Sequence, residues 1–406
     1  MRSVLRAIWA VAFATRRRKL LSLGCLLCVL PVAGFVVVLV LWTLPVFRGH
    51  LTAVLNPNAA RGLIYFHDVE RTVPWSMHVV KISRERKDLE LHTLMGRGTS
   101  QGMDTVSEQV RHIPADWGRP VEAINGDLYN DRGDYVGDPE GLQIVRGELV
   151  SSPSPKRACF WLDPDSNPHC GDVRSQFEVT WADGRTTPLG LNEARADDAA
   201  VLYTTAVGAT TRTRGGVELV LERAGPGPWL PLAIGQTYTA RVREMKAVGD
   251  SPTTTNTLVL SLGPDLARQF PKLATKALLR ISTATEPALT GVRTALGGGP
   301  TLVAHGKAKE WSGVRMRHPR SAIGWNKEHI YLVVVDGRQL GLSAGMTFPE
   351  LADYLVKLGC EEALGLDGGG SATCWAYGSV VNSPSQGRER PSANGLVVLE
   401  TSHVSK

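Results

Sequence analysis

The sequence has few cysteines and lacks the spacings of common metal and glycosylation motifs. Six cysteines occur in 406 residues, with no H-E-x-x-H motif and no paired C-x-x-C outside an apolar segment near the N-terminus. These absences exclude a zinc site of the usual spacing. No Asn-x-Ser/Thr sequon is present, which favours a bacterial source over a eukaryotic surface protein.

The excess of positive charge is confined to the N-terminus. The chain has 45 Lys and Arg residues against 39 Asp and Glu residues, a formal net charge of +6. Six of the basic residues lie in the first nineteen positions, which contain no acid, and this leaves 39 basic against 39 acidic residues. The neutral body gives no indication of nucleic-acid binding.

A long apolar segment, residues 20–44, follows this basic tail. It exceeds the roughly 20 residues that span a bilayer as a helix, and Arg16–Lys19 before it predict an N-terminus in the cytoplasm. We interpret residues 1–19 as a cytoplasmic tail, 20–44 as a single-pass signal-anchor in the bacterial cytoplasmic membrane, and 45–60 as a linker. The alternative is a cleaved signal peptide, but the segment is longer than a usual h-region and lacks a small-x-small cleavage site.

The rest of the chain predicts one α+β domain over residues 61–400, followed by a short tail at 401–406. Short runs of alternating or continuous apolar residues predict many strands, in mixed sheets with few helices. Arg146-Gly147 between two such runs predicts a hairpin, and residues 151–175, rich in Pro, Ser and Asp, predict a loop. Thr347–Leu358 is the clearest amphipathic helix, with Thr347 as its N-cap.

Four cysteines fall in this domain: Cys159, Cys170, Cys360 and Cys374. An even number in an oxidising compartment predicts Cys159–Cys170 and Cys360–Cys374 disulfides. The second pair would bracket Asp367. The alternative is four reduced, buried thiols.

The segment around Asp367 carries the strongest signal for a functional site. A short apolar run ends at this carboxylate, and three glycines and a hydroxyl follow it: Gly368, Gly369, Gly370 and Ser371. Glycines let the backbone approach a ligand closely, and free N–H groups bind anions. This segment therefore predicts a site for an anionic or sugar-like ligand.

A second carboxylate, Asp127, follows another apolar strand through Asn125 and Gly126. Taken alone, Asn-Gly is a standard type I′ turn signal. Asp127 and Asp367 together indicate more, because glycoside hydrolysis uses two carboxylates, one as acid or base and the other as nucleophile or water activator.

Three further candidates each have a structural alternative. Gly299 belongs to a glycine cluster that precedes a strand rather than a helix, so it fails the context of a dinucleotide or P-loop motif, and close packing is the alternative. His318 and Arg320 stand before a strand and predict phosphate binding, or a solvated basic turn. Asp336 ends a buried strand and predicts an acid, a metal ligand or a turn former. The Ser371 segment lacks the second glycine of a nucleophile elbow, which disfavours a serine hydrolase.

Six stretches occur in an order that resembles the phosphodiester glycosidase family, over roughly residues 60–400. They read AINGDLY, GLQIVRGEL, GGGPTLVAHGK, HPRSAIGW, YLVVVDGRQLGLSAGMTFPELADYLVKLGCEEALGLDGGGSATCW and VVNSPSQGRERPSANGL. The resemblance implies hydrolysis of the glycosyl-phosphate bond in a sugar-1-phosphodiester. On these motifs we assign catalytic roles to Asp367, Asp127 and Arg320. We assign substrate binding to Asn125, Gly368, Gly369, Gly370, Ser371, His318, Gly299 and Asp336.

We therefore expect a membrane-anchored hydrolase whose domain lies outside the cytoplasm and acts on an envelope or extracellular glycan such as exopolysaccharide. The alternative is a non-catalytic glycan-binding or envelope-assembly protein on the same fold. The expected partners are the glycan substrate and the membrane, through residues 20–44, and not nucleic acid. The sequence requires no cofactor, and Asp127, Asp336 and Asp367 are the residues that would hold a divalent cation.

Overall fold

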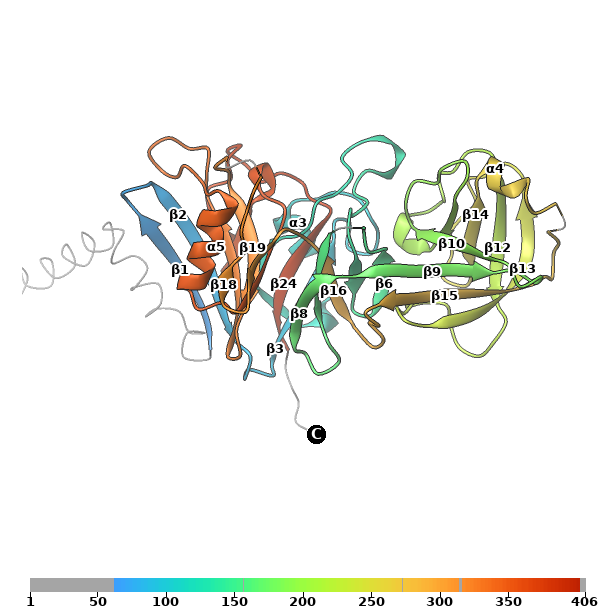
Figure 1. The fold of residues 1–406 in the computed structure, drawn as a ribbon, viewed down its shortest axis with the longest axis horizontal. Coiled ribbons are helices and arrows are strands. Elements are labelled where there is room, and N and C mark those ends of the chain that lie inside the picture. The colour runs from blue at the N-terminus through green and yellow to red at the C-terminus, as the bar shows by residue number, and fades with distance from the viewer. Residues whose placement is uncertain (1–61, 156, 272, 314–315, 402–406) are drawn as a thin grey trace, which may run out of the picture. The chain divides into compact units, whose positions relative to one another are not determined.

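The computed structural model describes residues 62–401 apart from positions 156, 272 and 314–315 (Figure 1). The chain separates into one unit of Met1–Pro57 and a second of Asn58–Lys406. The predicted cytoplasmic tail, membrane segment 20–44 and linker lie outside the described residues, as do positions 402–406. Within the described part of the chain, no helix combines the length and apolar character needed to cross a bilayer.

A seven-stranded antiparallel sheet, ordered β1-β2-β20-β19-β21-β17-β18, forms one layer of the second unit. Its strands are β1 (Leu63–Glu70), β2 (Trp75–Ser83), β17 (Thr301–Ala304), β18 (Lys307–Ala308), β19 (Arg320–Trp325), β20 (His329–Val335) and β21 (Glu362–Gly365). The predicted apolar strand β20 is confirmed. Both of its faces are covered: Leu332 and Val334 lie in one core cluster, and Val333 and Val335 in another.

Helix α5 (Phe348–Lys357) lies across one face of this sheet, and it confirms the predicted helix (Figure 1). Thr347 and Glu350 form a capping box at its start, which satisfies backbone N–H groups that have no partner within the helix. Leu351 and Leu355, one turn apart, are buried against the sheet. The helix carries the chain from β20 to β21, with β19 between these two strands.

A five-stranded sheet, ordered β23-β22-β4-β24-β3, shares a core with the opposite face. Its strands are β3 (Leu89–Met95), β4 (Arg119–Asn125), β22 (Cys374–Ala376), β23 (Ser379–Val380) and β24 (Asn394–Glu400). Ile124 and Leu396 from this sheet join the same core as Ile323 and Leu332. Helix α3 (Val106–Arg111) packs on a separate cluster on this sheet.

A third sheet, ordered β6-β5-β16-β7-β8, contains the predicted hairpin. Its strands are β5 (Gln143–Val145), β6 (Glu148–Ser151), β7 (Ala158–Leu162), β8 (Pro168–Asp172) and β16 (Thr294–Gly297). Arg146 and Gly147 have φ of +50° and +90°, as a type I′ turn requires. The predicted loop over residues 151–175 is wrong in part, because β7 and β8 form within it around the apolar Cys159-Phe160 pair.

Seven strands close into a barrel, ordered β10-β11-β14-β12-β13-β15-β9 (Figure 1). They are β9 (Arg174–Thr180), β10 (Thr186–Leu191), β11 (Ala200–Tyr203), β12 (Val217–Arg223), β13 (Thr237–Lys246), β14 (Leu258–Leu262) and β15 (Leu278–Glu286), with the short helix α4 (Pro264–Ala267) beside them. Among the described pairings only β10 and β11 run parallel. Leu219, Leu260 and Ile281 fill the interior.

The remaining helices among residues 62–401, where described, are single 3₁₀ turns: η2 (Ala115–Trp117), η3 (Gly133–Tyr135), η4 (Thr205–Val207) and η5 (Gly369–Ser371). The prediction of a strand-rich domain with mixed sheets and few helices is confirmed. The closed barrel was not predicted.

All four cysteines of the domain are free thiols, so the predicted disulfides are wrong. Cys170 lies opposite Phe160 in the β7–β8 ladder, one position away from Cys159. Neighbouring positions on a strand point to opposite faces, so Cys159 and Cys170 lie on different sides of the sheet. Cys360 belongs to the core under α5 and Cys374 to the core between the sheets, so the seven-stranded sheet separates them.

Candidate active site

Asn125, the last residue of β4, ties together the segments that build the site. Its side chain is fully buried, and its Nδ2 donates to the backbone oxygen of Asp367 at 2.6 Å. Its Oδ1 accepts from the Ser321 hydroxyl at 2.6 Å and from the Thr373 N–H at 3.2 Å. Neither Asn125 nor Gly126 has a positive φ, so the alternative of a type I′ turn is wrong.

The structure brings the two predicted carboxylates, Asp127 and Asp367, to neighbouring positions. The Asp367 N–H donates to the Gly126 oxygen at 2.9 Å. Gly126 immediately precedes Asp127, so this hydrogen bond brings the backbones of the two acids together. Their charges interact, and the negative charge of Asp367 contributes to raising the pKa of Asp127.

Asp127 is almost completely buried, at 1% exposure. Its Oδ1 accepts from the Arg157 guanidinium, while its Oδ2 is buried without a hydrogen-bond partner among the described residues. A Cβ on Gly141 or Gly297 would come within 2.6 or 2.2 Å of that Oδ2. Burial raises the pKa of Asp127 to about 7, and Arg157 only partly offsets it. The predicted glycine cluster therefore contributes close packing at Gly297.

Asp367 is the more accessible carboxylate, at 8% exposure. Its Oδ2 accepts from the Arg390 guanidinium at 3.1 Å, and Arg390 Nε donates to the Ser371 hydroxyl oxygen at 3.0 Å. Burial raises the pKa of Asp367, although hydrogen bonding to Ser371 and the charge of Arg390 act in the opposite direction. Arg390 was not predicted, although it lies within the last of the quoted stretches.

Two guanidinium groups flank the glycine segment after Asp367. A Cβ on Gly369, whose φ is +60°, would come within 3.3 Å of an Arg338 nitrogen. A Cβ on Gly370 would come within 3.3 Å of Arg390 Cδ. The absence of side chains at both positions lets the cationic groups lie close to the backbone, an arrangement suited to an anion.

His318 lies at the edge of this cationic region. Its Nδ1 is 3.1 Å from one guanidinium nitrogen of Arg338. Burial lowers the pKa of His318, and the charges of Arg338 and Arg320 lower it further. The neutral ring is thus the favoured form, with Nδ1 accepting from Arg338.

Arg320 is placed differently from the other predicted catalytic residues. Its Nε donates to the Met346 oxygen at 2.8 Å, another guanidinium nitrogen donates to the Met316 oxygen at 3.0 Å, and the group lies 3.9 Å over the Phe348 ring. Burial and the charge of Arg338 lower the pKa of Arg320 to about 10. These contacts hold its guanidinium on the α5 side, whereas the next residue, Ser321, contacts Asn125.

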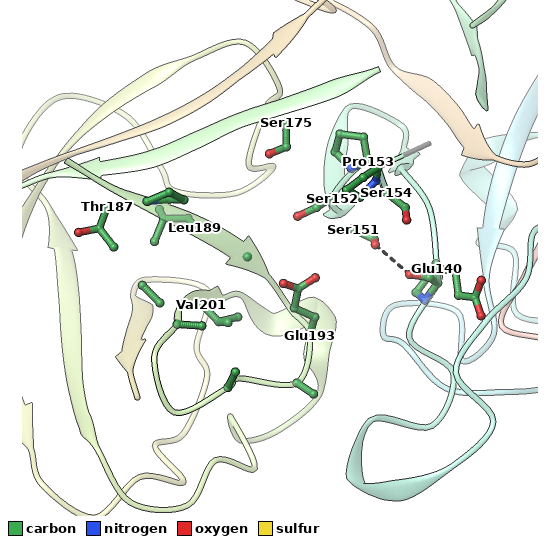
Figure 2. Close-up of a pocket in the computed structure, with 18 of the residues that line it drawn as sticks. Glu140, Ser151, Ser152, Pro153, Ser154, Ser175, Thr187, Leu189, Glu193 and Val201 are labelled. Carbon is green, nitrogen blue, oxygen red and sulfur yellow. Dashed lines mark hydrogen bonds between the residues drawn. The ribbon is translucent and has the colours of Figure 1, made fainter. Parts of the chain in front are cut away.

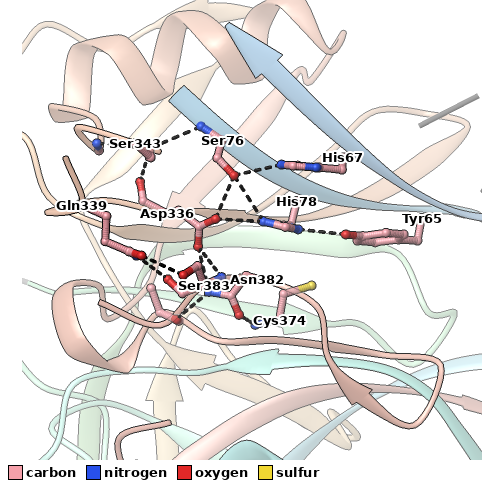
Figure 3. A network of polar contacts seen from close by, with 12 residues as sticks. Tyr65, His67, Ser76, His78, Asp336, Gln339, Ser343, Cys374, Asn382 and Ser383 are labelled. Carbon is pink, nitrogen blue, oxygen red and sulfur yellow. Dashed lines mark hydrogen bonds and ion pairs between the residues drawn. The ribbon is translucent and has the colours of Figure 1, made fainter. Parts of the chain in front are cut away.

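Asp336 forms the centre of a buried polar network (Figure 3). Its Oδ2 accepts from the Ser76 hydroxyl at 2.8 Å and from His78 Nε2 at 3.0 Å. Its Oδ1 accepts from Asn382 Nδ2 at 3.1 Å and from the Ser383 N–H at 2.9 Å. Burial opposes its charge, but these hydrogen bonds and the interaction with His78 lower its pKa overall. Asp336 therefore anchors the start of the segment that leads to Arg390.

The remaining predicted residues support the backbone of the site. The Gly299 N–H donates to the Gly365 oxygen at 2.8 Å, and a Cβ on Gly368 would come within 2.6 Å of the Pro319 oxygen. Across the described residues, no group of three or more His, Cys, Asp or Glu side chains is arranged to hold a metal ion.

Paired carboxylates beside a cation-flanked glycine loop are the kinds of groups that glycosidase-type hydrolases use. Residues 234–399 match the family model described as phosphodiester glycosidase. This match confirms the family resemblance over that part of the chain.

A curated relative is the SPbeta prophage-derived uncharacterized protein YomE of Bacillus subtilis (strain 168). It is 32% identical over 114 residues, and the alignment covers 27% of this chain but only 18% of YomE.

Two solved structures share the fold over most of the chain. A hypothetical protein from Synechocystis aligns with a TM-score of 0.67 and 21% identity, covering 84% of this chain and 63% of that chain. A protein from Burkholderia pseudomallei K96243 aligns with a TM-score of 0.62 and 21% identity, covering 81% of this chain and 74% of that chain. At these identities the likeness concerns the fold alone.

Proposed function

We propose that this protein hydrolyses the glycosyl-phosphate bond of a sugar-1-phosphodiester. The observation that carries the proposal is the position of Asp367. This partly accessible carboxylate adjoins the backbone of a second buried acid, Asp127, and contacts Arg390. One side of the site thus offers negative charge and the other offers positive charge. A substrate whose reacting carbon becomes positive while its leaving group is anionic matches that division.

The reaction breaks the bond between the anomeric carbon and the phosphate oxygen. A phosphate monoester leaves with that oxygen, water supplies a hydroxyl group to the anomeric carbon, and the water proton is released. Because phosphate is a good leaving group, the main requirement is stabilisation of charge rather than strong acid catalysis. Asp367 lies toward the oxocarbenium-like carbon in this scheme, and Asp127 adds negative charge behind it.

Arg390 and Arg338 are the groups we assign to the leaving phosphate, in place of Arg320. Both flank the Gly369-Gly370 backbone, and arginine binds phosphate oxygens through two parallel hydrogen bonds. The guanidinium of Arg320 is already engaged by two backbone oxygens and an aromatic ring. We also assign Ser371, which contacts Arg390, to binding of a phosphate or sugar oxygen.

The test measures sugar release by the purified full-length protein from a panel of sugar-1-phosphodiesters. Asp367→Asn is expected to lower the rate roughly 10²–10⁴-fold, the range typical of a group acting in the transition state. Asp131→Asn is the matched control, because Asp131 is an exposed carboxylate four positions after Asp127. Undiminished turnover by Asp367→Asn would contradict the assignment. Tight glycan binding without sugar release from any phosphodiester would identify a binding protein instead.

We further propose that the domain acts outside the cytoplasm on an envelope or extracellular glycan. Support comes from the apolar segment 20–44 and the basic residues before it. In intact spheroplasts, added protease should degrade the domain while sparing a cytoplasmic marker protein. Full protection of the domain until the cells are lysed would refute this location.

A further inference from the structure

A groove of about 600 Å³ lies between barrel strands and the segment after β6 (Figure 2). Strands β9, β10 and β11 contribute one wall, and residues 151–155 contribute another. Hydroxyl and carboxylate side chains gather along it: Ser152, Ser154, Ser175, Thr187 and Glu193. Among the described residues that line this groove, none carries a positive charge or an aromatic ring.

Two groups on opposite walls are prepared to bind a ligand rich in hydroxyl groups. The Ser152 hydroxyl oxygen is buried without a partner among the described residues, and Figure 2 shows Ser152 and Glu193 on facing sides of the groove. Burial raises the pKa of Glu193. A Cβ on Gly190 would come within 2.0 Å of Glu193 Oε1, so this glycine makes room for the carboxylate to lie over β10.

The groove is linked to the candidate active site by one guanidinium group. Arg157 donates to Glu140, a groove residue, at 2.7 Å and also to Asp127. A single guanidinium group spans only a few ångströms between its nitrogens, so the carboxylates of Glu140 and Asp127 lie close together. Asp367 and Asp127 do not themselves line the groove. A ligand in the groove would therefore lie beside the reacting group rather than on it.

We propose that this groove binds uncharged, hydroxyl-rich sugar residues that continue from the sugar whose anomeric carbon reacts. The proposal rests on the proposed function for its place in the reaction. Acceptors such as Glu193 favour donation from sugar hydroxyls, and the negative charge of a carboxylate disfavours anions along the wall that carries Glu193. The phosphate is bound on the Arg390 side, and the neutral glycan extends along the Asp127–Arg157–Glu140 side. The preferred substrate is an oligosaccharide phosphodiester rather than a single sugar phosphodiester.

Direct binding to the full-length protein separates this proposal from the catalytic one. The probes are neutral tetrasaccharides of glucose, mannose, galactose and N-acetylglucosamine, with tetragalacturonate as the anionic comparison, measured by calorimetry. At least one neutral tetrasaccharide should bind, and tetragalacturonate should bind at least tenfold more weakly. Ser175→Trp, which fills the groove from β9, should weaken binding of the neutral tetrasaccharide at least tenfold.

Gln176→Trp is the matched control, because it places the same ring on the next, exposed position of β9, outside the groove. Glu193→Gln provides a second variant that preserves side-chain size. It should reduce the ratio of the affinity for the neutral tetrasaccharide to the affinity for tetragalacturonate. Cleavage of a single-sugar phosphodiester should be unchanged in all three variants. The absence of binding by every neutral tetrasaccharide, or equal loss in the Gln176→Trp control, would overturn the groove proposal. If the unmodified protein cleaved no sugar phosphodiester at all, that result would instead overturn the proposed function.

Discussion

Asp127 and Asp336 are both buried carboxylates beyond the end of an apolar strand, yet their pKa values shift in opposite directions. Asp336 accepts four hydrogen bonds, and its pKa falls below the ordinary value. Asp127 has one oxygen on Arg157 and one without a partner among the described residues, and its pKa rises to about 7. The two exposed fractions, 1% and 2%, barely differ. The number of donors, rather than burial alone, therefore separates a structural carboxylate from a titrating one.

This contrast indicates different roles for the Asp336 network and for the Asp127–Asp367 pair. The Asp336 network joins β2 to Asn382 and Ser383, and so it fixes the segment that places Arg390. Asp127 and Asp367 adjoin each other at the cationic glycine loop, where we propose that the substrate supplies the missing interactions. The pKa of Asp367 is subject to both effects, because burial raises it while Ser371 and Arg390 oppose that rise.

The largest effect is expected from removing the structural carboxylate. Asp336→Ala leaves several buried donors, including His78 and Ser383 N–H, without an acceptor, and it should lower the free energy of unfolding by about 3–5 kcal/mol. Urea unfolding measures this value. Asp134→Ala removes an exposed carboxylate and should cost less than about 0.5 kcal/mol. If Asp336→Ala changed the free energy of unfolding as little as Asp134→Ala does, Asp336 would not be a structural carboxylate and its contrast with Asp127 would fail.

Arg390 tests the group that the Asp336 network positions. Arg390→Gln removes a charge that contacts Asp367 and Ser371, and it should weaken binding of the sugar-phosphate product roughly tenfold or more, as for a charge-assisted hydrogen bond. Competitive inhibition by that product provides the measurement. Arg388→Gln is the control, because Arg388 is an exposed arginine two positions earlier. Equal inhibition constants in both variants would exclude Arg390 from the phosphate site.

The pH dependence of turnover tests whether the charge of Asp127 reaches the reacting carbon. Below about pH 7 Asp127 is protonated, so less negative charge faces the positive transition state. The rate constant kcat/KM should therefore rise about tenfold between pH 5.5 and 8, and Asp127→Asn should show a low rate without that rise. A rate that falls across this range would contradict the electrostatic role of Asp127.

Local sequence signals predicted those parts of the fold that depend on neighbouring residues. The Arg146-Gly147 turn and the Thr347 N-cap are decided within a few positions, and both form as predicted. The barrel depends on pairings between distant strands such as β9 and β15, which alternation alone does not specify. The Cys159–Cys170 prediction used spacing and compartment without the register that places these side chains on opposite faces.

The candidate site was predictable where the chain itself marks a strand end. Asp127 and Asp367 each follow an apolar run with glycines beside it, and the structure places them next to each other. Arg338 and Arg390 lie in irregular segments, where an arginine that binds a ligand looks the same in sequence as a solvated one. Arg320 was predicted from its place beside His318 before a strand, but strand alternation directs its side chain toward α5 rather than toward Asn125.

The smallest expected effect concerns stability, and it has opposite signs for the two buried acids. Asp127 has a pKa of about 7 in the folded protein and 3.8 ordinarily, so between these values the unfolded chain loses its proton first and stability falls as pH rises. The amide introduced by Asp127→Asn does not titrate in this range. That variant should therefore be more stable than the unmodified protein by about 1 kcal/mol or more at pH 8 and nearly equal to it at pH 3.

For Asp336, whose pKa is lowered, the corresponding stability is present at neutral pH and is lost as pH falls through the folded pKa. Urea unfolding at pH 3 and pH 8 measures both signs, with Asp131→Asn as an exposed control that should change neither value. Glu140 still holds Arg157 in the Asp127→Asn variant, which limits the loss from the broken ion pair. If Asp127→Asn destabilised the protein at pH 8 as Asp336→Ala does, Asp127 would be a structural carboxylate, and Asp367 would be the one acid of the pair left for chemistry.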